Sequence, residues 1–121
     1  MSDYQLMAIG SRLDRVILYS ASISLEFIGR NDLIFTLAIN SDITLDGERP
    51  NDLYPLASRA FEALSMNIGG ILKLVDIGKN GGNKIVIEEM SFNIGQDAAS
   101  EGGDVRFIVN ENGNIVADNF F

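Results

Sequence analysis

The fold of this chain is decided by Ile23-Ser24-Leu25-Glu26-Phe27 and by Leu33-Ile34-Phe35-Thr36-Leu37-Ala38-Ile39, which are separated by the turn residues Gly29-Arg30-Asn31-Asp32. In the first segment apolar and polar residues alternate with the period of two that is typical of a half-buried strand. The intervening residues have the composition of a hairpin turn. In the second segment both faces are mostly apolar. We therefore predict that Leu33–Ile39 is a central strand of a sheet.

Working outward from this hairpin, one strand precedes it and one helix follows it. The short apolar run Val16–Tyr19 predicts the preceding strand. Across Leu53–Leu64, apolar residues recur at the three-and-four spacing of an amphipathic helix. Asn51 or Asp52 can cap its first turn, and Gly69-Gly70 ends it. Because its apolar stripe needs a partner surface, we place this helix on one face of the sheet.

The second half of the chain returns to strands. Ile71–Ile77 and Lys84–Phe92 flank a glycine-rich loop, and Val105–Val109 and Asn114–Phe121 close around Asn112-Gly113, a strong signal for a tight hairpin. The predicted fold class is α+β: an antiparallel, curved β-sheet of about six to seven strands with one main α-helix packed on one face. The length of 121 residues fits a single domain, residues 1–121, with one core.

Two missing residue types remove most familiar active sites. The chain has no cysteine and no histidine, which excludes thiol nucleophiles, serine triads with a histidine base and the usual zinc sites. Glu88 and Glu89 are adjacent on a predicted strand, so they would point to opposite faces and could not share a substrate. We predict that the protein is not an enzyme and has no catalytic residues, no metal site and no cofactor.

Three loops resemble ligand-binding loops only superficially. The glycine-rich loop at 78–84 is not a P-loop, because Lys84 opens a strand and not a helix. The stretch Asn110–Asn114 lacks the first acidic ligand and the closing glutamate of a calcium loop, and a β-turn explains it. Asp42, Asp46 and Glu48 could gather a cation, although loops of this composition are ordinarily solvated.

The distribution of basic residues argues against nucleic acid and membranes. The arginines are interspersed with acidic residues and form no basic stripe, and the predicted helix carries almost no basic residues. Met1–Gly10 has Asp3 and no basic cluster, which is unlike a signal or transit peptide. No window approaches the roughly 18 apolar residues of a membrane span. We predict a cytoplasmic protein.

The acidic residues are concentrated near the C-terminus. The net charge is −8, with a pI near 4.3. Residues 86–121 contain seven acidic residues and one basic residue, against ten and eight in the first 85. Negative charge can simply keep a small protein soluble, but if these segments lie side by side they form an acidic face that steers a basic protein. The candidate partner-binding residues are Glu88, Asp97, Glu101, Asp104, Glu111 and Asp118.

Aromatic side chains are the candidate apolar anchors of such an interface. Tyr4, Tyr19, Tyr54 and Phe120-Phe121 qualify by residue type, because aromatic residues often dominate binding energy. A place in the core is an equally good reading for Phe120 and for Tyr54.

The first third of the chain carries a family resemblance. The succession of Leu13–Leu18, Ile23–Phe27 and Leu33–Leu37 resembles the opening β-meander of small immunity proteins from bacterial polymorphic-toxin and contact-dependent growth-inhibition systems. The resemblance implies a cytosolic α+β domain that binds one cognate toxin and blocks its active site or substrate groove. It assigns no role to any individual residue.

Three functions remain open. The first is a protein inhibitor, such as an immunity protein, that neutralises a basic toxin domain, for example a nuclease, through its acidic surface. The second is a structural or assembly module that forms homo-oligomers through sheet edges. The third is a small enzyme or ligand-binding domain. Only the first predicts a salt-sensitive interface with a partner, and only the third requires a pocket with converging polar groups.

Overall fold

A computed structural model of the protein describes residues 3–19, 22–40, 43–45, 59–77, 83–94 and 105–120. In these residues the helices are α1 (Asp3–Ala8) and α2 (Arg59–Met66), with a short 3-10 turn at Arg30–Asp32. The strands are β1 (Arg12–Leu18), β2 (Ile23–Ile28), β3 (Leu33–Ile39), β4 (Ile43–Leu45), β5 (Leu72–Asp76), β6 (Lys84–Ile87), β7 (Met90–Ile94), β8 (Val105–Glu111) and β9 (Asn114–Phe120).

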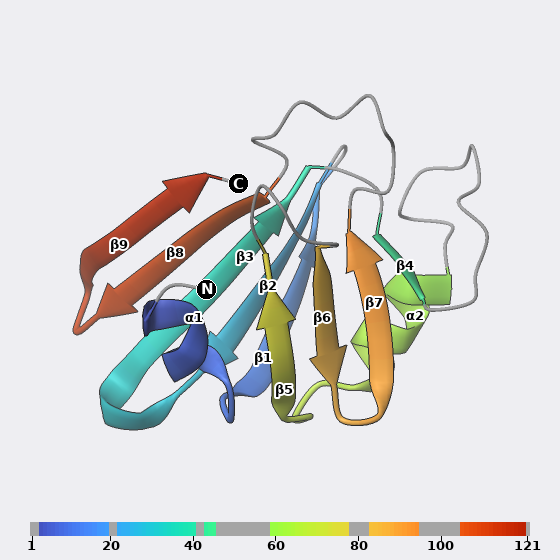
Figure 1. The fold of residues 1–121 in the computed structure, drawn as a ribbon, viewed down its shortest axis with the longest axis horizontal. Coiled ribbons are helices and arrows are strands. Elements are labelled where there is room, and N and C mark those ends of the chain that lie inside the picture. Colours follow the sequence, from blue (N-terminus) through green and yellow to red (C-terminus); the bar gives the residue numbers. More distant parts are fainter. Residues whose placement is uncertain are drawn as a thin grey trace.

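The strands form two sheets. Five strands form the larger sheet in the order β1-β2-β3-β8-β9, and four form the smaller sheet in the order β4-β7-β6-β5 (Figure 1). Every pairing in the described ranges is antiparallel. The antiparallel α+β class is confirmed, but the prediction of one sheet with six to seven strands is wrong. Because β8 takes the place beside β3, the chain between them builds a separate sheet.

The two sheets are joined at one corner, where the start of β1 meets the start of β5. The backbone N–H of Gly10 donates to the carbonyl of Leu72 at 2.8 Å, and that of Leu13 donates to Gly70 at 2.9 Å. A Cβ atom added at Gly70 would lie only 2.9 Å from the backbone carbonyl oxygen of Asn67. The tight junction therefore requires glycine at this position.

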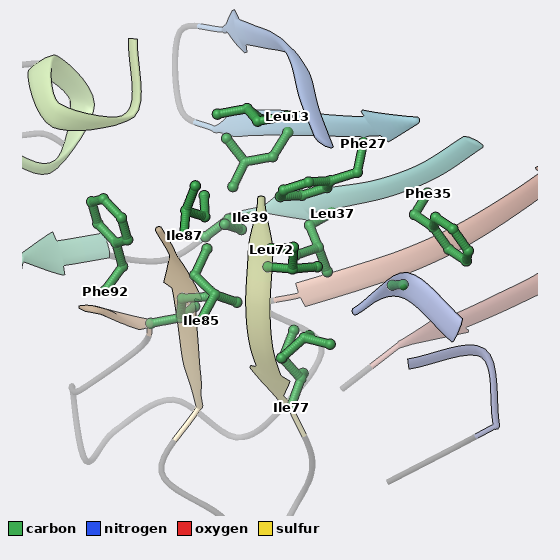
Figure 2. Packing of buried hydrophobic residues seen from close by; sticks show 14 of the residues in the cluster. Leu13, Phe27, Phe35, Leu37, Ile39, Leu72, Ile77, Ile85, Ile87 and Phe92 are labelled. Carbon is green, nitrogen blue, oxygen red and sulfur yellow. The ribbon is translucent and has the colours of Figure 1, made fainter. Parts of the chain in front are cut away.

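The core is a single cluster of buried apolar side chains from both sheets (Figure 2). The larger sheet contributes alternate residues such as Phe27 and Leu37, and the smaller sheet contributes Ile85 and Phe92, all 1 % exposed or less. Burial of large apolar side chains is the main stabilising term in such a fold.

The predicted hairpin and the central place of its second strand are confirmed. Ile23, Leu25 and Phe27 are buried, and β3 is the third of five strands. The opposite face of β3 is not covered in the same way, because Ile34 remains 36 % exposed. The apolar composition of β3 therefore correctly indicated its central place in the sheet, although only one face of the strand is fully buried.

The Asn112-Gly113 hairpin is also confirmed. Both residues have positive φ, 52° and 87°, as a two-residue hairpin turn with right-handed strand twist requires. The backbone N–H of Gly113 donates to Oδ1 of Asn110 at 2.9 Å, which stabilises the turn further.

The prediction of one strand over Lys84–Phe92 is wrong. Glu88 and Glu89 do not point to opposite faces of a strand; they form the turn between β6 and β7. Glu88 adopts φ 54°, which is unusual for a residue with a side chain. Two hydrogen bonds to Ile71 hold it there: the Glu88 N–H donates to the Ile71 carbonyl, and the Ile71 N–H donates to Glu88 Oε1, both at 2.9 Å.

The helices lie at opposite ends of the smaller sheet, α1 beside the edge strand β5 and α2 beside the edge strand β4 (Figure 1). The one predicted helix corresponds to α2. Its predicted start, including Asn51 and Asp52, lies outside the described residues, and its described part ends at Met66, before Gly69-Gly70 as predicted. The sequence reading did not predict α1. Its position is set by Gln5, whose Nε2 donates to the carbonyl of Ile77 at 3.2 Å. Neither described helix has the length and apolar character to cross a membrane.

Candidate protein-binding surface

The structure describes three of the six candidate partner-binding residues. Glu88 is in the β6–β7 turn of the smaller sheet, whereas Glu111 and Asp118 belong to the β8–β9 hairpin of the larger sheet. All three are exposed. Asp97, Glu101 and Asp104 lie outside the described residues, in the segment that joins β7 to β8. The described residues thus place two candidates on one hairpin and the third on another sheet.

The β8–β9 hairpin projects beyond the smaller sheet, at the left of the molecule in Figure 1. In the described ranges β9 pairs only with β8 and forms the edge of the larger sheet. Residues 114–119 are exposed except for Ala117, which is half-buried, and Ile115 and Val116 are 61 % and 41 % exposed. An edge strand of this kind offers unpaired backbone groups and apolar side chains to another chain.

An ion pair orders the outer face of this hairpin. Arg106 donates from Nε to Asp118 Oδ1 at 2.8 Å and from its terminal nitrogen Nη2 to Asp118 Oδ2 at 2.6 Å. Because Asp118 is opposite Ile108 in the strand register, the two charged residues are diagonal neighbours. The one basic residue of the acidic C-terminal region is therefore already engaged with one of its acids.

This pair shifts the titration of Asp118. The side-chain hydrogen bonding of Arg106 lowers the pKa of Asp118 below its ordinary value, Coulombic attraction adds to the shift and partial desolvation opposes it. A carboxyl with a lower pKa in the folded than in the unfolded state stabilises the fold at neutral pH. That contribution is lost as the pH falls through the folded-state pKa.

We expect the carboxyl carbon of Asp118 to titrate, in a pH series of NMR spectra, below the ordinary range of an aspartate. Arg106→Gln removes the guanidinium and should return the midpoint to that range, whereas Arg15→Gln, on β1 at the other edge of the sheet, should leave it unchanged. An ordinary midpoint in the unmodified protein would contradict the pairing.

The candidate aromatic anchors are placed differently from one another. Tyr19 is 53 % exposed and available at the surface, whereas Tyr4 is half-buried and packs against the core. Tyr54 and Phe121 lie outside the described residues, and of Phe120 only the backbone is described. Sequence reasoning missed Ile115 and Val116. The sequence does contain a signal for them: two adjacent apolar residues follow closely after the Asn112-Gly113 turn, so one of the two must lie on the face of the strand away from the core.

The described residues contain no group of three or more aspartate or glutamate side chains arranged to hold a metal ion. The other described ion pair joins Arg15 Nε to Glu26 Oε2 at 2.7 Å across β1 and β2, on the face of the sheet that points away from Leu25 and Phe27. The described residues thus contain two ion pairs, Arg15–Glu26 and Arg106–Asp118.

Comparison of the chain with protein-family models, with curated proteins and with solved structures finds no match in any of the three.

Proposed function

We propose that this protein is a non-catalytic inhibitor that binds a basic protein, in the manner of an immunity protein that neutralises a toxin domain. The observation that carries this proposal is the charge asymmetry of the chain, with seven acidic residues and one basic residue in residues 86–121. Negative charge at this density accelerates encounter with a basic surface and sets the orientation of the complex.

The β8–β9 hairpin supports the proposal because it offers apolar surface and backbone hydrogen-bonding groups in addition to charge. Steering by charge affects mainly the rate of association, whereas a long-lived complex needs apolar area and directional hydrogen bonds. The exposed Ile115 and Val116 provide apolar area, and the open edge of β9 provides backbone donors and acceptors. Such a surface can cover the substrate groove of a partner without chemistry of its own.

The first test is affinity capture from the source cells, washed with low and then high salt and analysed by mass spectrometry. We expect a basic protein that elutes when the salt is raised, because screening weakens charge attraction. The partner is then expressed by itself and tested for an activity that this protein suppresses at equal molar amounts. A basic protein whose activity is unaffected would contradict the inhibitor proposal.

A second candidate function, self-assembly, is favoured by the composition of β9. Edge strands are commonly protected from pairing by lysine or proline, and Asn114–Phe120 contains neither. A bulge does interrupt the β8–β9 ladder between Val109 and Asn110, which weakens this candidate. Recovery of only the protein itself in the capture experiment, together with a dimer in analytical ultracentrifugation, would favour assembly over inhibition.

A further inference from the structure

A groove of about 650 Å³ lies where α1, the start of β1 and the β2–β3 turn meet. Figure 1 shows these three elements together at the lower left of the molecule. The groove is remote in sequence from the acidic C-terminal region, since its described lining comes from residues 6–7, 9–12, 28–31, 33 and 71. Its volume is in the range of sites that take small organic ligands.

The walls of the groove are aliphatic. On the side of α1, Leu6 and Met7 are 54 % and 52 % exposed, and across the groove Ile28 is 42 % exposed. Ile9, Leu33 and Ile71 complete the apolar lining. In the described part of the chain no aromatic side chain lines the groove, so these walls offer no stacking surface for a base or another flat ring. An aliphatic chain is the ligand that such walls fit best.

The charge of the groove is opposite to that of the protein. Arg12 and Arg30 line it, and no acidic residue does among the residues that the structure describes, although acidic residues outnumber basic ones by 17 to 9 in the chain. Within the described residues, neither guanidinium has a hydrogen-bond or ion-pair partner. Two guanidinium groups at an apolar groove are suited to a carboxylate, which each can bind with two parallel hydrogen bonds.

The backbone around the groove is already ordered. The Gly10 and Leu13 hydrogen bonds of the sheet junction hold the start of β1, and the Gly29 N–H donates to the Leu33 carbonyl at 2.8 Å across the β2–β3 turn. In that turn Asn31 adopts φ 58°, a conformation that asparagine tolerates better than most residues. A groove that is formed in advance loses little affinity to reorganisation when a ligand binds.

We propose that this groove binds a small alkyl carboxylate, with the chain against the aliphatic walls and the carboxylate paired with Arg12 and Arg30. This site is independent of the proposed inhibitor function and is formed by other residues. The proposal combines the apolar walls with the local positive charge, and it requires both parts of the ligand: neither the head group nor the chain alone should bind well.

The test is an NMR titration of the ¹⁵N-labelled protein with octanoate, butyrate and 1-octanol. We expect saturable octanoate binding, with the largest amide shifts in residues 6–12 and 28–33. Each fully buried methylene strengthens binding by about fourfold, so butyrate, which has four methylenes fewer, should bind about tenfold more weakly than octanoate even if the chain is only half buried. Octanol, which lacks the charge, should also bind about tenfold more weakly. Equal binding of octanoate and octanol would overturn the proposal, as would the absence of saturation.

Two charge-matched variants locate the head group. Arg12→Gln with Arg30→Gln should weaken octanoate binding about tenfold and leave octanol binding unchanged. Lys73→Gln with Lys84→Gln, on β5 and β6, removes the same charge and should leave octanoate binding unchanged. Equal loss of octanoate affinity in both variants would show that only the net charge of the protein matters, and would overturn the proposed site. Binding to vesicles of anionic phospholipid without binding of monomeric octanoate would assign the groove to a lipid surface and also overturn the proposal.

Discussion

Phe27→Ala is expected to lower the free energy of unfolding by about 4 kcal/mol, the scale of large-to-small substitutions in a tightly packed core. Phe27 is fully buried in β2, with Leu13 opposite it on β1 and Phe35 opposite it on β3. Loss of the ring removes contacts with both neighbouring strands and leaves a cavity between the two sheets. Small domains are stable by only about 5 to 15 kcal/mol, so much of the total would be lost.

Urea unfolding measures this effect, and Ile115→Ala is the matched control. Ile115 is also an apolar strand residue but is 61 % exposed, so its truncation should change stability by less than about 0.5 kcal/mol. The slope of the unfolding free energy against urea concentration should stay the same in both variants. Similar losses for Phe27→Ala and Ile115→Ala would contradict the arrangement of two sheets around one core.

Reversal of Asp97, Glu101 and Asp104 together to lysine should slow association with the basic partner by about 10- to 100-fold at low salt, because long-range attraction increases encounter rates by factors of this size. The effect should shrink as salt is added, since screening shortens the range of the interaction to about 10 Å at 0.1 M. Association and dissociation rates are measured on the immobilised partner over a series of salt concentrations.

The control for this reversal changes net charge to the same extent elsewhere. Asp14, Glu62 and Asp76 are exposed on β1, α2 and β5, and their reversal to lysine changes the charge of the protein by the same six units. A local acidic face predicts a much smaller effect for this variant. Equal slowing by both variants would show that only net charge matters, and unchanged kinetics in the first variant would remove this segment from the binding surface.

Elements that obey local rules could be predicted from the sequence. The alternation of Ile23, Leu25 and Phe27 identified β2 because a half-buried strand requires a period of two. Asn112-Gly113 identified the last hairpin because both residues tolerate positive φ. The central position of β3 followed from the mostly apolar composition of both its faces.

Elements that depend on distant contacts could not be predicted. The turn at Glu88-Glu89 contains no glycine, asparagine or proline, and it is stabilised by hydrogen bonds to Ile71, 17 residues away. The six residues of α1 are too few for a stable isolated helix and need their contact with Ile77. The division into two sheets follows from the pairing of β3 with β8, which no local pattern encodes.

In the candidate surfaces too, some features could be predicted from the sequence and others depend on the fold. The acidic excess of residues 86–121 is a property of composition and was visible in the sequence. The pairing of Arg106 with Asp118 depends on strand register, and the groove with Arg12 and Arg30 depends on the approach of α1 to the β2–β3 turn. Both arise only when the chain is folded.

The central claim, that the acidic C-terminal region binds a basic protein, is tested most directly by capture from the source cells with the wild-type chain and the two charge-reversed variants side by side. The proposed function predicts one basic protein that binds the wild type and the Asp14/Glu62/Asp76 variant, elutes with salt and is lost from the Asp97/Glu101/Asp104 variant. Recovery of the same proteins by all three chains, or of no basic protein by the wild type, would contradict it.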